Sequence, residues 1–266
     1  MTIRRGLPLA IAAVSTVVVA CTAATDVTSV PYGFVTVVAQ TAGAGYTASP
    51  VASFFDARGL GAPGAVSAWD SCRVQPYSPG AVLSFGDVYP SIGAGSAVAV
   101  KFGARTDSLF PVAVGREIQY KLRTPTSIPY TPGDSVSVVV PGNSDGYPAI
   151  SFRAKTAEAV AVTNFGTPNG ASRLDLRWNA AQDLNATMTV SFRFGASGAD
   201  SLNTQIYCQF KDDGADSIPA RYMASWAQAP TRSWTAQRVR SYVASVAKGG
   251  YFNFISTFDV PTPASP

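Results

Sequence analysis

The chain has 266 residues, of which 14% are charged, with a formal net charge of +4 and no histidine. The lack of histidine excludes Ser-His-Asp and Cys-His nucleophile systems and removes the commonest zinc ligand. Two of the arginines, Arg4 and Arg5, lie in the first twenty residues, which hold no acid, and the rest of the chain carries about +2. A charge this small does not indicate a nucleic-acid-binding protein.

The first twenty residues have the pattern of an export signal. A positive start, MTIRR, is followed by an apolar run from Leu7 to Val19. This run is too short to cross a bilayer as a helix, which needs about 20 residues. The sequence VVAC, residues 18–21, resembles the lipobox of bacterial lipoproteins, which implies cleavage before Cys21 and acylation of its thiol and new amino group. The alternative is an ordinary secretory signal that is cleaved nearby.

The residues that follow predict where such a protein is held. Several acyl chains would anchor it stably, whereas one chain anchors only marginally. Thr22 rather than aspartate follows the cysteine, which by the sorting rule of two-membrane bacteria favours the outer membrane. Residues 21–31 are small and polar without periodicity, so we expect a tether there after a signal peptide at residues 1–20.

The rest of the chain predicts an all-β protein. Short runs rich in Val, Phe, Tyr and Thr alternate with Gly and Pro turns, as in sandwiches and barrels. The expected strands are 33–41, 51–57, 66–74, 96–104, 116–124, 135–140, 149–154, 159–165, 172–178, 187–194 and 203–210.

A segment with three prolines, residues 124–134, predicts either a boundary between lobes or a crossover between sheets. We expect two antiparallel Ig-like or jelly-roll-like β-sandwich lobes, at residues 32–126 and 127–266. In 187–194 the alternation of large apolar with small polar residues predicts one buried and one solvent-facing side.

Two segments near the C-terminus have helix-like features. Residues 217–226 predict one short helix, with Ser217 as its cap and Pro219 in its first turn. Residues 233–248 carry apolar residues at helical spacing, but Gly249 and Gly250 stand between two β-prone runs. Since glycine pairs favour tight turns between strands, we expect a hairpin.

The cysteines Cys72 and Cys208 form an even pair once Cys21 is assigned to the anchor. Oxidation is allowed in an exported chain, so we expect a disulfide between them. Two separately buried thiols that behave as small apolar residues are the alternative.

Two clusters are candidate sites. Asp212, Asp213 and Asp216 offer carboxylates to calcium, although Asp-Gly is also a turn dipeptide. On an extended strand, one face carries four residues whose rings and guanidinium groups suit an anionic glycan or lipid headgroups: Trp234, Arg238, Arg240 and Tyr242. The alternative is a solvent-facing strand whose long side chains cover apolar surface.

Several stretches together resemble an uncharacterised group of secreted or lipid-anchored β-sandwich proteins of bacteria. They are the lipobox, AWDSCRV, LDLRW, IYCQFKDDGADSIPARYM and STFDVP. The group has a tryptophan strand, a cysteine strand, an acidic glycine turn and an Ile-Pro helix start, which Trp178, Cys208, Asp212-Asp213-Gly214 and Ile218-Pro219 would match. The resemblance covers about the last 130 residues. It implies the sandwich fold and no activity.

These observations predict a lipid-anchored, non-enzymatic protein of the cell envelope with a binding or structural role at the membrane surface. Its expected partners are the membrane, through the anchor, and a glycan or another envelope protein. No cofactor is expected unless the aspartates bind Ca²⁺. The alternatives are a carbohydrate-recognising module and a hydrolase that uses carboxylates alone, which needs two acids about 5 to 9.5 Å apart.

Overall fold

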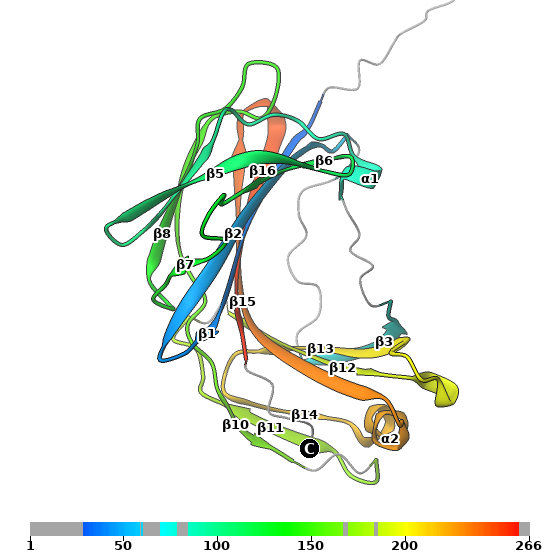
Figure 1. Cartoon of the computed structure of the whole chain (residues 1–266). Helices are drawn as coiled ribbons and strands as arrows, with labels where there is room; N and C mark the ends of the chain where they lie inside the picture. The colour runs from blue at the N-terminus through cyan, green and yellow to red at the C-terminus, as the bar shows by residue number, and fades with distance from the viewer. Residues whose placement is uncertain are drawn as a thin grey trace, which may run out of the picture.

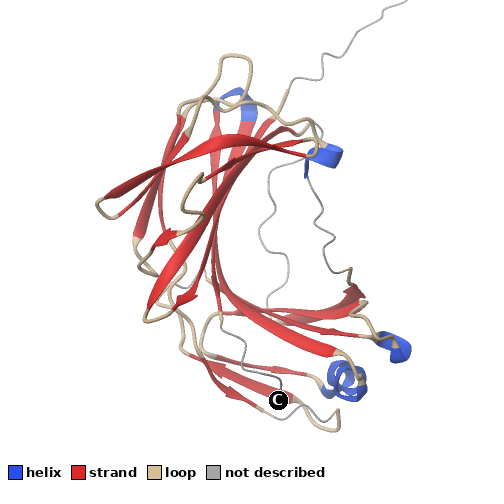
Figure 2. Cartoon of the chain, viewed as in Figure 1, coloured by secondary structure: helices blue, strands red, loops and turns tan. Residues whose placement is uncertain are grey.

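The computed structural model describes residues 29–58, 60, 70–78, 85–166, 170–183 and 186–260. Strands dominate this part of the chain, so the all-β prediction is confirmed (Figure 2). The predicted signal peptide, Cys21 and most of the predicted tether lie outside the described residues. No helix in the described ranges is long and apolar enough to cross a membrane.

One large mixed sheet contains thirteen of the described strands (Figure 1). Its order is β3-β13-β12-β15-β16-β1-β2-β6-β5-β4-β8-β9, with β7 attached to β2. The bounds are β1 (Pro31–Ala42), β2 (Gly45–Asp56), β3 (Ser71–Pro76), β4 (Val98–Phe102), β5 (Arg105–Val114), β6 (Glu117–Lys121), β7 (Ile128–Pro129), β8 (Ser135–Val140), β9 (Ile150–Lys155), β12 (Thr187–Phe194), β13 (Thr204–Lys211), β15 (Arg232–Val246) and β16 (Gly250–Asp259).

A second sheet has the order β10-β11-β14. Its strands are β10 (Val162–Phe165), β11 (Leu174–Trp178) and β14 (Ala215–Ile218). Two α-helices are described, α1 (Phe85–Val88) and α2 (Ala220–Gln228), together with the 3-10 turns η1 (Ala196–Gly198) and η2 (Ala247–Gly249).

The large sheet does not divide at residue 126. Strand β1 lies between β2 on one side and β16 on the other, and β3 pairs with β13. Strand β15 is fifteen residues long and pairs with β12 through its first part and with β16 through its second. Figure 1 shows β15 passing from one half of the molecule into the other. The two expected lobes are therefore joined by one sheet.

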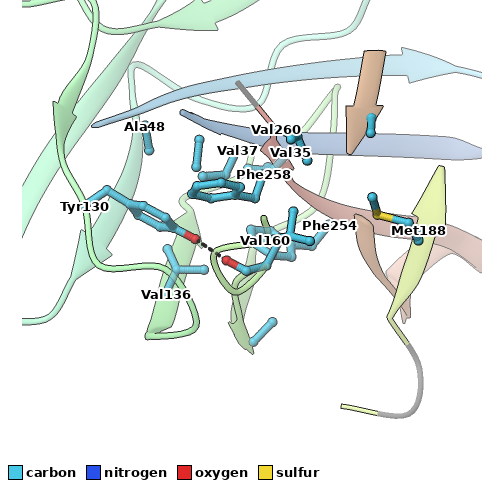
Figure 3. Close-up of a cluster of buried hydrophobic side chains, with 14 of the residues drawn as sticks. Val35, Val37, Ala48, Tyr130, Val136, Val160, Met188, Phe254, Phe258 and Val260 are labelled. Carbon is cyan, nitrogen blue, oxygen red and sulfur yellow. Dashed lines mark hydrogen bonds between the residues drawn. The ribbon is translucent and has the colours of Figure 1, made fainter. Parts of the chain in front are cut away.

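In one half, strands β4, β8 and β9 fold back over β16, β1 and β2. The ring of Phe152 on β9 lies 5.1 Å from that of Phe252 on β16, centroid to centroid. Figure 3 shows how side chains from distant parts of the chain meet there, with Val35 and Val37 of β1 beside Phe254 and Phe258 of β16. Alternate residues of these strands are buried because each strand presents one face to this core.

In the other half, the three-stranded sheet and α2 cover the face of β12, β13 and β15 that carries the large apolar residues. Trp178 of β11 stacks on Phe210 of β13, and Trp226 of α2 meets Phe192 of β12 edge to face. The indole Nε1 of Trp226 also donates to the carbonyls of Arg193 and Ser233, both at 3.2 Å. The helix is thus held by packing and by hydrogen bonds to two adjacent strands.

The predicted short helix is present, but its expected cap is wrong. Ser217 lies in β14, where it is the register partner of Asp175 on β11. The helix starts after Pro219, whose extended backbone provides the N-cap without a side-chain hydrogen bond. Strand pairing therefore outweighs the capping preference of Ser217.

The predicted solvent-facing side of β12 is also wrong. Thr187, Thr189 and Ser191 are buried, like the apolar residues between them. Thr189 pairs with Gln209 on one neighbouring strand and with Gln237 on the other. Because the small hydroxyl residues lie between longer side chains in the middle of the sheet, they are covered although they are polar.

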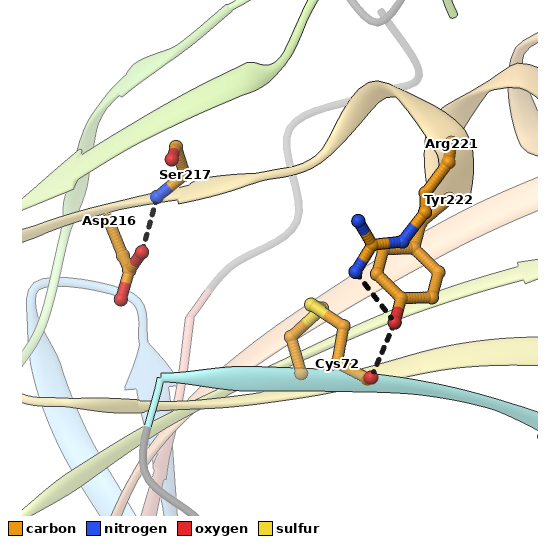
Figure 4. The surroundings of a disulfide bond; sticks show 6 residues. Cys72, Asp216, Ser217, Arg221 and Tyr222 are labelled. Carbon is orange, nitrogen blue, oxygen red and sulfur yellow. Dashed lines mark hydrogen bonds between the residues drawn. A yellow bond between two sulfur atoms is a disulfide. The ribbon is translucent and has the colours of Figure 1, made fainter.

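The predicted disulfide between Cys72 and Cys208 is confirmed. The two cysteines are direct register partners on β3 and β13. Figure 4 shows that Tyr222 of α2 adds a second link, because its hydroxyl donates to the carbonyl of Cys72 at 3.0 Å. The disulfide therefore holds β3, an edge strand of the large sheet, to its neighbour.

Replacing Cys72 and Cys208 together by serine is expected to lower the free energy of unfolding by up to about 5 kcal/mol, because the bridge closes a loop of more than a hundred residues. Urea denaturation measures this loss, and reduction of the wild type should reproduce it. Ser71→Ala, at an exposed neighbour of Cys72, is the control. Equal unfolding midpoints for the oxidised and reduced wild type would contradict the prediction.

Candidate functional site

The predicted hairpin near the C-terminus is present. β15 and β16 pair antiparallel and are joined by η2, where Lys248 and Gly249 both have positive φ angles. Residues 234 to 242 of β15 are extended, so Trp234, Arg238, Arg240 and Tyr242 lie on one face, as expected from the period of a strand.

That face points into the molecule, which makes the prediction of an exposed ligand surface wrong. Arg238 is 0% exposed, Arg240 2% and Trp234 4%, while Tyr242 is partly buried. The segment 156–161 lies against this face, since its backbone carbonyls accept hydrogen bonds from both arginines. The burial of Trp234, Arg238 and Arg240 therefore contradicts an exposed binding surface on this face.

Arg238 forms a buried, bidentate ion pair with Asp212. Its Nε and Nη2 both donate to the carboxylate, with 2.9 Å between Nη2 and Oδ1. The same carboxylate accepts from the indole Nε1 of Trp178 at 2.7 Å. The guanidinium also donates to the carbonyls of Ala159, at 3.0 Å, and Asn179. Both charges are thus paired and hydrogen-bonded, as buried charges must be.

Arg240 forms a second cluster with two acids. Its Nη2 lies 3.0 Å from Oε1 of Glu158 and 3.2 Å from Oδ2 of Asp183, and its Nη1 donates to the carbonyl of Thr156 at 3.2 Å. The hydroxyl of Tyr242 donates to Asp183 at 3.3 Å. Burial is the main cause that raises the pKa of Tyr242, so this hydroxyl keeps its proton as a donor.

Both arginines donate hydrogen bonds to the segment 156–161, which leads from β9 to β10. Arg240 binds the carbonyl of Thr156, the hydroxyl of Tyr130 binds that of Ala157, and Arg238 binds that of Ala159. The Ala157 amide donates to the hydroxyl of Ser256 at 2.9 Å. Side chains therefore satisfy most of these backbone groups, and the amide of Gly133 also donates to the carbonyl of Ala157 at 3.1 Å. We call Arg238, Arg240, Asp212, Glu158 and Asp183 the arginine cluster.

Arg238→Met is expected to lower the free energy of unfolding by about 3 to 5 kcal/mol, because it leaves the carboxylate of Asp212 buried without its partner. The double variant with Asp212→Leu should recover part of the loss. Urea denaturation measures both.

The matched control for this prediction is Arg173→Met. Arg173 pairs with Asp175 at 2.9 Å, but both side chains are largely exposed, so the expected loss is below about 1 kcal/mol. Equal losses for Arg238→Met and the control would show that the buried pair does not stabilise the fold.

The three aspartates do not form the calcium site considered from the sequence. Asp212 is paired with Arg238, and Asp213 accepts from the backbone amide of Ala215 across the turn at Gly214. Burial is the main cause that raises the pKa of Asp216, which disfavours the charged form that calcium binds. No cluster of three or more His, Cys, Asp or Glu residues in the described ranges could hold a metal ion.

A cavity of about 640 Å³ lies beside β15, close to where β16 and β1 end. We call it the β15 groove. Its described lining residues are Gln40, Thr41, Arg193, Thr235, Ala236, Gln237, Asp259 and Val260. Thr235 and Gln237 belong to the face of β15 opposite the buried arginines.

The polar groups of the β15 groove are of several kinds. The side-chain amide of Gln237 donates to Asp259 at 2.8 Å, and burial is the main cause that raises the pKa of Asp259. The guanidinium of Arg193 lies 4.6 Å from the ring centroid of Tyr77, and its Nε has no hydrogen-bond partner in the described ranges. Amide, hydroxyl, carboxyl and guanidinium groups together suit a ligand rich in hydroxyl groups.

Asp259 is the only carboxylate among the described residues that line the groove. Hydrolysis by carboxylates alone needs a second acid across the site, so this arrangement fits binding better than hydrolysis. The groove was missed from the sequence although a signal was present. Hydroxyl and amide residues occupy alternate positions of β15, at 233, 235 and 237.

Comparison with models of known protein families finds no match to the chain, and no curated protein matches it significantly in sequence.

Proposed function

We propose that the chain is a lipid-anchored protein of the bacterial cell envelope that has no enzymatic activity and binds a ligand at the membrane surface. The observation that carries this proposal is the disulfide between Cys72 and Cys208. A disulfide is typical of exported proteins, and this pairing leaves Cys21 as the remaining cysteine, within its lipobox-like sequence.

The position of the first strand supports an anchor at Cys21. β1 starts at Pro31, about ten residues after the cysteine. A chain of this length spans at most about 36 Å when fully extended. The lipid would therefore hold the folded part close to the bilayer, and Thr22 favours the outer membrane as the site of attachment.

Cys21→Ala is expected to abolish acylation and to move the protein from the membrane fraction to the soluble fraction, because it removes the thiol and the lipobox cysteine on which acylation depends. Intact mass spectrometry measures the added acyl mass, and detergent partition measures the change of phase. Thr22→Ala, one residue later, is the control and should remain acylated. The anchor is refuted if wild type and Cys21→Ala show the same added mass relative to their polypeptides and the same detergent partition.

The second candidate function is recognition of a carbohydrate, and the β15 groove favours it. Its donors and acceptors include the hydroxyl of Thr235, the amide groups of Gln40 and Gln237, and the guanidinium of Arg193. Hydroxyl-rich ligands are bound through such groups when a concave surface arranges them. Another envelope protein is the alternative partner for the same groove.

The double variant Gln40→Ala and Thr235→Ala is expected to weaken binding of a glycan by about fivefold to a hundredfold, because two hydrogen bonds at about 0.5 to 1.5 kcal/mol each are lost. A glycan array with the wild type identifies the ligand, and titration compares the variants. Thr106→Ala, an exposed strand position of β5, is the control. Absence of wild-type binding to every glycan would reject this candidate and leave the protein partner.

A further inference from the structure

The hairpin between β5 and β6 ends in an exposed apolar tip. Every residue from Pro111 to Arg116 is exposed, and the tip consists of Pro-Val-Ala-Val-Gly-Arg. In a strand that covers a core, alternate residues are buried. Here both sides of the strand are exposed, including Val112 at 44% and Val114 at 41%. The end of β5 therefore exposes apolar side chains on both of its faces, although its register partner Glu117 on β6 is buried.

The register of the sheet places this tip at the end of the molecule from which β1 starts. Val112 pairs with Gln119 of β6, Gln119 pairs with Ser53 of β2, and Ser53 pairs with Phe34 of β1. The hydroxyl of Ser53 also donates at 2.6 Å to Glu117, which pairs with Val114 beside the turn of the hairpin. Three strand spacings of about 4.8 Å separate β1 from β5, so the tip lies about 14 Å to the side of the first strand.

A second exposed apolar side chain lies at the same end. Val88, at the end of α1, is 69% exposed. Two residues later, the carbonyl of Pro90 accepts from the amide of Asp56 at 2.9 Å, and Asp56 is the register partner of Pro31. Figure 1 shows α1 and β6 at the end of the molecule where β1 begins.

We propose that Val88, Val112 and Val114, with Arg116 beside them, form a surface that inserts into the lipid bilayer. We call it the apolar tip. This inference rests on the proposed lipid anchor at Cys21 and adds the orientation of the folded part: the end that carries the start of β1 faces the membrane.

The short stretch of chain before β1 indicates that the partner of this surface is the lipid bilayer. About ten residues lie between Cys21 and Pro31, and they span at most about 36 Å. The end where β1 starts is thus the end that the anchor holds near the bilayer. Apolar side chains with a neighbouring cation suit the boundary between acyl chains and phosphate headgroups. Arg116 provides such a cation directly after the apolar residues.

The apolar tip is tested with the full, acylated chain in vesicles of phosphatidylethanolamine and phosphatidylglycerol. Val112→Cys introduces a thiol for an environment-sensitive fluorophore, while Cys72 and Cys208 are joined in a disulfide and the Cys21 thiol is acylated. Tyr46→Cys is the matched control. Tyr46 is 38% exposed, comparable with Val112, and lies seven residues from Ser53 along β2, about 24 Å away.

The expected result is a blue-shifted emission at position 112 and quenching by nitroxide-labelled lipids at least about twofold stronger than at position 46, because insertion reaches roughly 5 to 10 Å into the headgroup boundary. Both replaced side chains are exposed, so the fold should tolerate the changes.

Equal quenching at the two positions in an acylated, vesicle-bound protein overturns the inference and leaves the anchor intact. A protein that mass spectrometry shows to be unacylated overturns the proposed function, and the inference with it. The two failures are therefore distinguishable in one sample.

Discussion

The guanidinium groups of Arg238 and Arg240 lie inside the molecule, where a charge without partners would be strongly unfavourable. Their partners come from three separate places in the chain: Asp212 after β13, Asp183 after β11, and Thr156 to Ala159 between β9 and β10. Satisfying two arginines therefore determines where the small sheet and the segment 156–161 lie relative to the large sheet. The cluster lies beside β15, the strand through which the single sheet joins both halves.

The pattern of alternating residues predicted most strands, and residues 135–140 and 187–194 match β8 and β12. The alternation of β15 also gave its faces correctly, but not which one is buried, because arginine is almost never buried without a partner and its partners are distant in sequence. β5 was missed because half of it has no buried face and therefore no alternation. The β15 groove depends on where β16 and β1 end side by side, which is a property of register and not of local sequence.

The two faces of β15 have different chemical characters. One face carries arginines whose charges are paired with carboxylates inside the fold. Substitution on this face therefore changes the free energy of unfolding. The other face carries hydroxyl and amide groups beside a cavity. A strand can serve both roles because its side chains alternate, and a substitution at an even or an odd position of β15 tests a different property of the protein.

The parallel pairing of β1 with β16 places the first described strand beside the last. Every other described pair in the ladder is antiparallel, and β1 and β16 lie in the middle of the sheet rather than at its edge. During synthesis the N-terminal strand emerges first and must wait for residue 259 before its second neighbour is complete. Contacts so distant in sequence form slowly, and an incomplete β1 exposes an unpaired edge to other chains. A chain of this design needs protection from premature association until its last strand is available to pair.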